Sequence, residues 1–106
     1  LAGRYDPLSP PVLSVMSRLI DDATTGGVPV TVCGEMAGRP LEAMTLIGLG
    51  FSSLSMSPGA LPPVKAMIRS LDVGALSSYL GRLITAPDRS VREKLRAFAA
   101  DHKIAI

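Results

Sequence analysis

Apolar residues recur at intervals of three and four positions in five parts of the chain, and this spacing predicts five helices. Each predicted helix starts at a residue type that favours a helix N-terminus, either a capping side chain or a proline of the first turn: Ser9, Pro40, Pro62, Asp72 and Ser90. Glycine ends helices readily, so we expect the first helix to end at Gly26 and the second between Gly48 and Gly50.

Two short segments between the first three helices, residues 28–32 and 51–55, predict buried strands. Strands that alternate with helices of this length indicate parallel βα units. Two parallel strands cannot cover both of their faces alone, and a complete (β/α)₈ barrel needs about 250 residues. We therefore expect an α/β fold in which residues 1–106 are one unit, the last two βα units and the terminal helices of such a barrel.

The composition argues against several classes of protein. Of the 106 residues, 47% are hydrophobic and 19% are charged, which is typical of a globular chain. The net charge of +2 and the aromatic content of 4% argue against a nucleic-acid surface. No apolar run reaches the roughly 20 residues that span a membrane, and no segment has the order of a signal peptide. A single cysteine cannot form an internal disulfide, so we expect a cytoplasmic protein.

The strongest candidate for chemistry is Cys33, which directly follows the first predicted strand. Functional residues of barrels gather at the carboxyl ends of strands, and Gly34 leaves room for a ligand to approach the backbone. A thiol at this place can act as a general acid or as a nucleophile, and the residues alone do not choose between these roles. The alternative is that Cys33 is simply a small buried hydrophobic residue.

Other polar residues near the two predicted strand ends have ordinary explanations. Glu35 is a ligand, a residue that supports a ligand, or a carboxylate that stabilises a helix start, and Ser55 and Ser57 fit a strand end and a cap as well as a substrate contact. His102 is the one histidine and is expected to be a solvated residue of the tail, so a cysteine–histidine pair with Cys33 is disfavoured.

The residues around Cys33 resemble the C-terminal signature of phosphoenolpyruvate-utilising enzymes. That family includes enzyme I of the bacterial sugar phosphotransferase system and pyruvate phosphate dikinase. This sequence is most similar to the nitrogen-related branch of enzyme I. The Cys-Gly-Glu element in its strand context is a specific part of the signature. The resemblance covers nearly the whole chain, through residues 5–10, 30–38, 46–51, 54–58 and 64–69.

The resemblance implies a barrel that binds phosphoenolpyruvate and Mg²⁺. In such enzymes the phosphoryl group passes to a histidine on a separate N-terminal domain and then to a phosphocarrier protein, HPr or its nitrogen-branch equivalent. A cysteine at the position of Cys33 protonates the enolate that remains, which gives pyruvate, and Gly34 leaves room for the substrate. Enzymes of this type also form homodimers through their barrels.

Several parts of the family's site are expected to lie before Leu1, where we expect further chain. The surroundings of Arg4 do not match the family's substrate arginine, and His102 is not the phosphorylated histidine. The Mg²⁺ ligands are also expected elsewhere, so we predict that these 106 residues alone are inactive. Two alternatives stay open: a dikinase-type enzyme of the same family, and a non-catalytic module for dimerisation or assembly.

Overall fold

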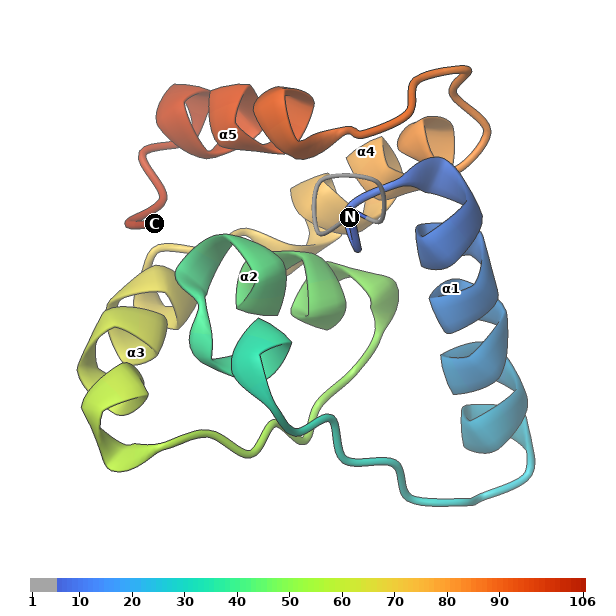
Figure 1. The fold of residues 1–106 in the computed structure, drawn as a ribbon, viewed down its shortest axis with the longest axis horizontal. Helices are drawn as coiled ribbons and strands as arrows, with labels where there is room; N and C mark the ends of the chain where they lie inside the picture. Colours follow the sequence, from blue (N-terminus) through green and yellow to red (C-terminus); the bar gives the residue numbers. More distant parts are fainter. Residues whose placement is uncertain (1–5) are drawn as a thin grey trace.

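Helices make up most of the computed structural model, which describes residues 6–106. Five α-helices occur within that range, and Figure 1 shows α2 at the centre, between α1 and α3, with α5 crossing above it. Their bounds are α1 Pro10–Thr25, α2 Pro40–Leu49, α3 Leu61–Arg69, α4 Val73–Leu83 and α5 Arg92–Asp101, with short 3-10 turns at Glu35–Gly38 and Pro58–Ala60. The five predicted helices are therefore confirmed.

Local sequence signals account for most of the helix ends. Proline occupies the first turn of α1, α2 and α3, where its missing N–H group would have no partner in any case. The carboxylate of Asp72 accepts a hydrogen bond of 3.1 Å from the N–H of Ala75 at the start of α4. Gly50 ends α2 with a φ of 120°, which favours glycine. Ser9 occupies the N-cap position of α1, but its side chain makes no capping bond. The Ser90 hydroxyl accepts a 3.2 Å hydrogen bond from the N–H of Arg92, the first residue of α5, which confirms Ser90 as a cap.

The two predicted strands are wrong in extent. Within residues 6–106, segments 28–32 and 51–55 share one parallel bridge, between Val32 and Leu54, and form no continuous strand. The N–H of Val32 donates to the carbonyl of Ser53 at 3.0 Å, and the N–H of Ser55 donates to the carbonyl of Val32 at 2.8 Å. A strand inside a parallel sheet has a neighbouring strand on each of its two edges. Two segments alone give each other a neighbour on one edge only. The α/β class is therefore not confirmed, although the pairing is parallel, as a βα repeat requires.

The centre of the hydrophobic core is α2, which contacts α1, α3, α4 and α5. Eight of its ten residues are buried, so this helix packs on all sides instead of along one stripe. Gly48 lets α4 approach closely, because a Cβ at this position would lie 2.6 Å from Cδ1 of Leu80 and 2.7 Å from Cγ of Leu76. α2, which begins directly after Arg39, is thus held in place by packing.

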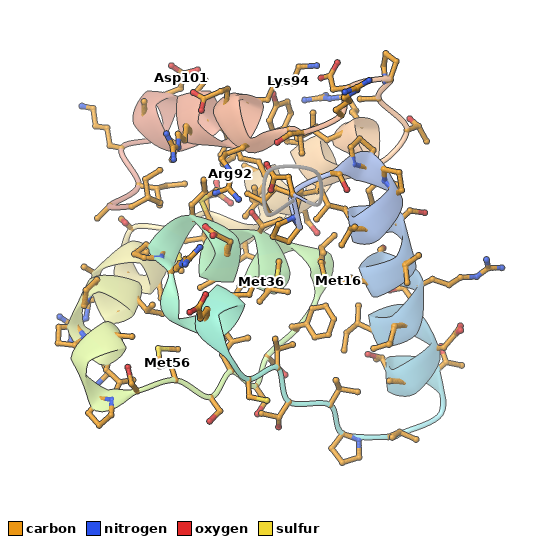
Figure 2. All side chains as sticks on the ribbon, viewed as in Figure 1. Met16, Met36, Met56, Arg92, Lys94 and Asp101 are labelled. Carbon is orange, nitrogen blue, oxygen red and sulfur yellow. The ribbon has the colours of Figure 1, made fainter. Side chains whose placement is uncertain are left out.

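An ionic network joins Asp6, the first described residue, and Arg92, at the start of α5, to α2. The guanidinium of Arg92 donates 2.9 and 3.2 Å hydrogen bonds to the two carboxylate oxygens of Asp6, and it lies 3.4 Å from the carboxylate of the buried Glu42. Figure 2 shows Arg92 between α5 and α2. The Asp6 carboxylate also accepts hydrogen bonds from the Ser90 hydroxyl and the Leu8 N–H. The hydrogen bond from Arg92 is the main reason why the pKa of Asp6 falls from 3.8 to about 2.

One helix turns apolar side chains outward. Val12, Val15 and Leu19 form an exposed apolar stripe on α1, at the helical spacing of one face. No helix in the described part of the chain combines the length and the apolar character that crossing a membrane requires.

Candidate functional site

A cleft of about 560 Å³ brings together the two predicted strand ends. The segment that follows Val32 forms one wall and the segment that follows Leu54 forms the other, because the parallel bridge between these two residues aligns the segments. The residues that line the cleft come from these two segments and from the adjoining 3-10 turns: Cys33, Gly34, Glu35, Gly38, Arg39, Ser55, Met56, Ser57 and Ala60. The two places singled out in the sequence, Cys33–Glu35 and Ser55–Ser57, therefore line the same cleft.

Cys33 is a free, exposed thiol, and the alternative of a small buried hydrophobic residue is wrong. It directly follows Val32, whose N–H and C=O are both hydrogen-bonded to the facing segment. The backbone on one side of the thiol is thus fixed, while the thiol itself is open to the cleft. An accessible sulfur on an anchored backbone is suited to proton transfer and to nucleophilic attack alike.

Gly34 has a backbone conformation that only glycine adopts easily. Its φ of 94° and ψ of −169° lie in a region where a side chain is strained by about 1–3 kcal/mol. A Cβ built at Gly34 would meet nothing within 4 Å, so the space beside the backbone is open. The glycine therefore serves two purposes at once: it turns the chain out of the bridge, and it leaves the cleft unobstructed.

A second glycine closes the cleft at its far side. A Cβ at Gly38 would lie 3.2 Å from the Cβ of Ala60 and 3.6 Å from that of Met56. Because Gly38 has no side chain, the 3-10 turn Glu35–Gly38 packs directly against the opposite wall. Of the two serines on that wall, Ser57 precedes the turn Pro58–Ala60 without a side-chain capping bond, and Ser55 is exposed.

The charged groups of the cleft are Glu35 and Arg39, and reasoning from the sequence did not select Arg39. One terminal nitrogen of Arg39 lies 3.2 Å from Glu35, and the other lies 3.6 Å from Glu42. Glu42 is buried in α2 and also pairs with Arg92, so the cleft is linked to the ionic network that includes Asp6. The signal in the sequence was the place of Arg39, directly before the proline that opens a helix at the site.

His102 lies outside the cleft, in a separate hollow between α4 and α5. Its ring stacks on that of Phe98 with centroids 3.9 Å apart, and its Nδ1 lies 3.0 Å from the Phe98 carbonyl oxygen. His102 is exposed, as predicted for a solvated residue, and its ring also packs at the end of α5. Cys33 and His102 line different hollows, which agrees with the prediction that they form no catalytic pair. Arg4 lies outside the described residues.

A scan against protein families matches residues 1–73 to the PEP-binding domain of PEP-utilising enzymes. This chain belongs to that family. The match includes every residue that lines the Cys33 cleft, so the resemblance inferred from the Cys-Gly-Glu element is confirmed.

Several named relatives are similar to most of the chain. A phosphoenolpyruvate-protein phosphotransferase of Cupriavidus necator is 40% identical over 83% of the chain, and one of Borreliella burgdorferi is 32% identical over 84%. A multiphosphoryl transfer protein of Xanthomonas campestris is 36% identical over 97%. The chain spans only 12% to 16% of the length of these three relatives.

The described residues do not fit a Mg²⁺ site, although members of this family generally use that ion. Mg²⁺ prefers octahedral oxygen ligands, often carboxylates. Within residues 6–106 no three His, Cys, Asp or Glu side chains lie close enough together to hold a metal. Glu35 supplies the one carboxylate among the residues that line the cleft, and Arg39 pairs with it. We therefore derive no step of the chemistry through a metal bound to these residues.

Proposed function

We propose that this chain forms one side of the phosphoenolpyruvate site of a phosphotransferase. In this proposal residues 1–106 are the C-terminal part of a barrel domain, and the phosphoryl group moves to a histidine of the enzyme and then to a phosphocarrier protein. The observation that carries the proposal is the cleft in which an exposed thiol, an open glycine and a cation lie together in a chain of the PEP-utilising family.

The role proposed for Cys33 is to protonate carbon. Transfer of the phosphoryl group breaks the bond between phosphorus and the enol oxygen, forms a bond from phosphorus to a histidine nitrogen, and leaves the enolate of pyruvate. The Cys33 thiol gives its proton to the methylene carbon, and the resulting thiolate takes a proton from water. Exposure to the cleft supports this role, because the sulfur is accessible from the side where a three-carbon substrate would lie.

Gly34 is proposed to contact the substrate through its backbone. Open space beside its Cα lets a ligand approach more closely than any side chain would permit. The cleft therefore pairs a proton donor with a binding surface of main-chain atoms.

Further properties follow from this proposal for the whole enzyme. They are Mg²⁺ held by residues outside this chain, a carrier of the HPr type that docks on a separate domain, a homodimer, and a cytoplasmic, nitrogen-regulating branch of the system. The branch is tested by offering a sugar-branch and a nitrogen-branch carrier to the natural full-length enzyme, which has its own carrier-docking domain. Faster phosphorylation of the sugar-branch carrier would refute the branch assignment.

A chimera tests the function directly. The matching 88-residue segment of the Cupriavidus necator phosphotransferase, which is 40% identical, is replaced by this chain, and phosphoenolpyruvate consumption and pyruvate release are measured. We expect the chimera to be active and the 106 residues alone to be inactive. A folded chimera without activity would refute the proposal. Turnover by the chain alone would refute the prediction that these 106 residues hold only part of the active site. A nucleotide-binding domain upstream of this chain in the natural protein would favour the dikinase alternative.

Cys33→Ala in the active chimera tests the proton donor. We expect the dissociation constant of phosphoenolpyruvate to stay within about twofold and pyruvate release to fall roughly 100-fold or more, the usual contribution of a general acid. Cys33→Ser is the matched control of similar size, and its weakly acidic hydroxyl should restore little activity. Turnover of Cys33→Ala at the normal rate would show that another group supplies the proton.

One observation favours a second candidate, the assembly module. The exposed stripe of Val12, Val15 and Leu19 on α1 would be covered by self-association, and among residues 6–106 the bridged segments pair with no further strand. Light scattering at micromolar concentration tests this for the isolated chain. An oligomer is expected, and a stable monomer would argue against the module.

A further inference from the structure

We propose that Arg39 is the anion-binding residue of the Cys33 cleft, and that Glu35 occupies its guanidinium until an anionic substrate displaces it. This inference rests on the proposed function, since the anion in question is the carboxylate or phosphate of phosphoenolpyruvate. Among the residues that line the cleft, Arg39 is the one cation. It shares the cleft with the thiol proposed to act on the same substrate.

The contact between Arg39 and Glu35 is the kind that a ligand displaces easily. The two side chains are 61% and 88% exposed, and their closest atoms are 3.2 Å apart. Exposed pairs of this kind contribute little, because water solvates both charges and long side chains lose freedom when they pair. A substrate oxyanion that enters the cleft can therefore replace the Glu35 carboxylate at little cost.

The second contact of Arg39 keeps the guanidinium at the cleft when Glu35 leaves. Glu42 lies 3.6 Å from Arg39 through one oxygen and 3.4 Å from Arg92 through the other. Its side chain is only 4% exposed, so a carboxylate that water barely reaches attracts both cations and helps to hold Arg39 in place. Arg92 in turn is held by Asp6, which fixes the far side of the arrangement.

The backbone of Arg39 is fixed as well. Arg39 immediately precedes α2, and its carbonyl accepts a 2.8 Å hydrogen bond from the N–H of Ala43. The side chain therefore starts from a rigid point, and its planar fork of donors matches the geometry of a carboxylate or a phosphate. Arginine is suited to this task because two parallel hydrogen bonds orient the anion as well as attract it.

Alkylation of Cys33 in the 106-residue chain tests the inference. Cys33 is the one cysteine of the chain, so the rate of modification reports on this cleft alone. In both reactions the thiolate displaces iodide and forms a carbon–sulfur bond, but iodoacetate is an anion and iodoacetamide is neutral. The rate with iodoacetate divided by the rate with iodoacetamide measures anion recognition, because any change in the thiolate population affects both reagents equally.

We expect Arg39→Gln to lower this ratio by roughly threefold to tenfold, as loss of one nearby charge and its hydrogen bonds would. Arg39→Lys should fall between, since it keeps the charge and loses the fork. Glu35→Gln should raise the ratio, because the guanidinium is then free. Arg18→Gln is the matched control: it makes the same charge change on α1, outside the cleft, and should leave the ratio unchanged. Circular dichroism verifies that each variant is folded.

The outcomes separate this inference from the proposed function. An unchanged ratio in Arg39→Gln, or an equal fall in Arg18→Gln, overturns the role of Arg39, and no rise in Glu35→Gln overturns the displacement. If phosphoenolpyruvate protects Cys33 from alkylation, and this protection is weaker in Arg39→Gln, both proposals are supported. If phosphoenolpyruvate did not protect Cys33 of the wild-type chain from alkylation while the ratio still depended on Arg39, the anion site would stand. The binding of phosphoenolpyruvate by this chain would then be refuted.

Discussion

Among the described glycines, Gly48 is the one at which an added methyl group should disturb the fold most. In Gly48→Ala the new Cβ would lie 2.6 Å from Cδ1 of Leu80 and 2.7 Å from Cγ and Cδ2 of Leu76. Both leucines are almost fully buried, so their neighbours limit how far they can move aside. The helices α2 and α4 must therefore separate or the leucines must leave their preferred rotamers.

The size of the effect follows from two opposing terms. Overpacking of a close-packed core costs about 1–3 kcal/mol, whereas alanine in a helix is favoured over glycine by up to about 1 kcal/mol. We expect a net loss of about 1–2 kcal/mol in the free energy of unfolding, measured by urea denaturation of the chain followed by circular dichroism.

Gly81→Ala is the matched control, because Gly81 lies in α4 with nothing within 4 Å of its Cβ position. There the helix term acts alone, and the variant should be more stable by up to about 1 kcal/mol. Leu80→Ala should be less harmful in Gly48→Ala than in the wild type, because it makes space for the methyl group. If Gly48→Ala were as stable as the wild type, the close contact of α2 with α4 would be refuted.

Two further predictions concern stability. Asp6 has its pKa lowered to about 2 in the folded chain, so it stabilises the fold above pH 3.8, and that contribution is lost as the pH falls from 3.8 toward 2. Asp6→Asn should lower the free energy of unfolding at pH 7 by about 1–2 kcal/mol and flatten its dependence on pH in that window; an unaltered acid limb in urea titrations would contradict this. Asp72→Ala should cost about 1 kcal/mol by loss of its bond to the Ala75 N–H, whereas Ser9→Ala, which removes no capping bond, should change thermal stability little. Equal losses in the two variants would refute the difference.

The candidate site was only partly accessible to reasoning from the sequence. Cys33 and Gly34 were found because a short apolar segment ended at a cysteine and a glycine, and Ser55 and Ser57 were found by the same rule. Arg39 was missed because its meaning depends on Glu42 and Arg92, and Arg92 lies 53 positions further along the chain. A charge near a site acquires a role only when its partners are known.

The sequence by itself determined the local structure of this protein: five helices, their proline and aspartate starts, the glycine that ends α2, and the family that the cysteine motif indicates. These features depend on residues within a few positions of each other, so they can be predicted from short stretches of the sequence. Only the tertiary structure decided that each predicted strand amounts to a single bridge, at Val32 and Leu54, and that Asp6, Arg92, Glu42 and Arg39 lie in one ionic chain that leads to the cleft. Strand pairing and ion pairs of this kind depend on partners supplied from elsewhere in the fold, which no local pattern specifies.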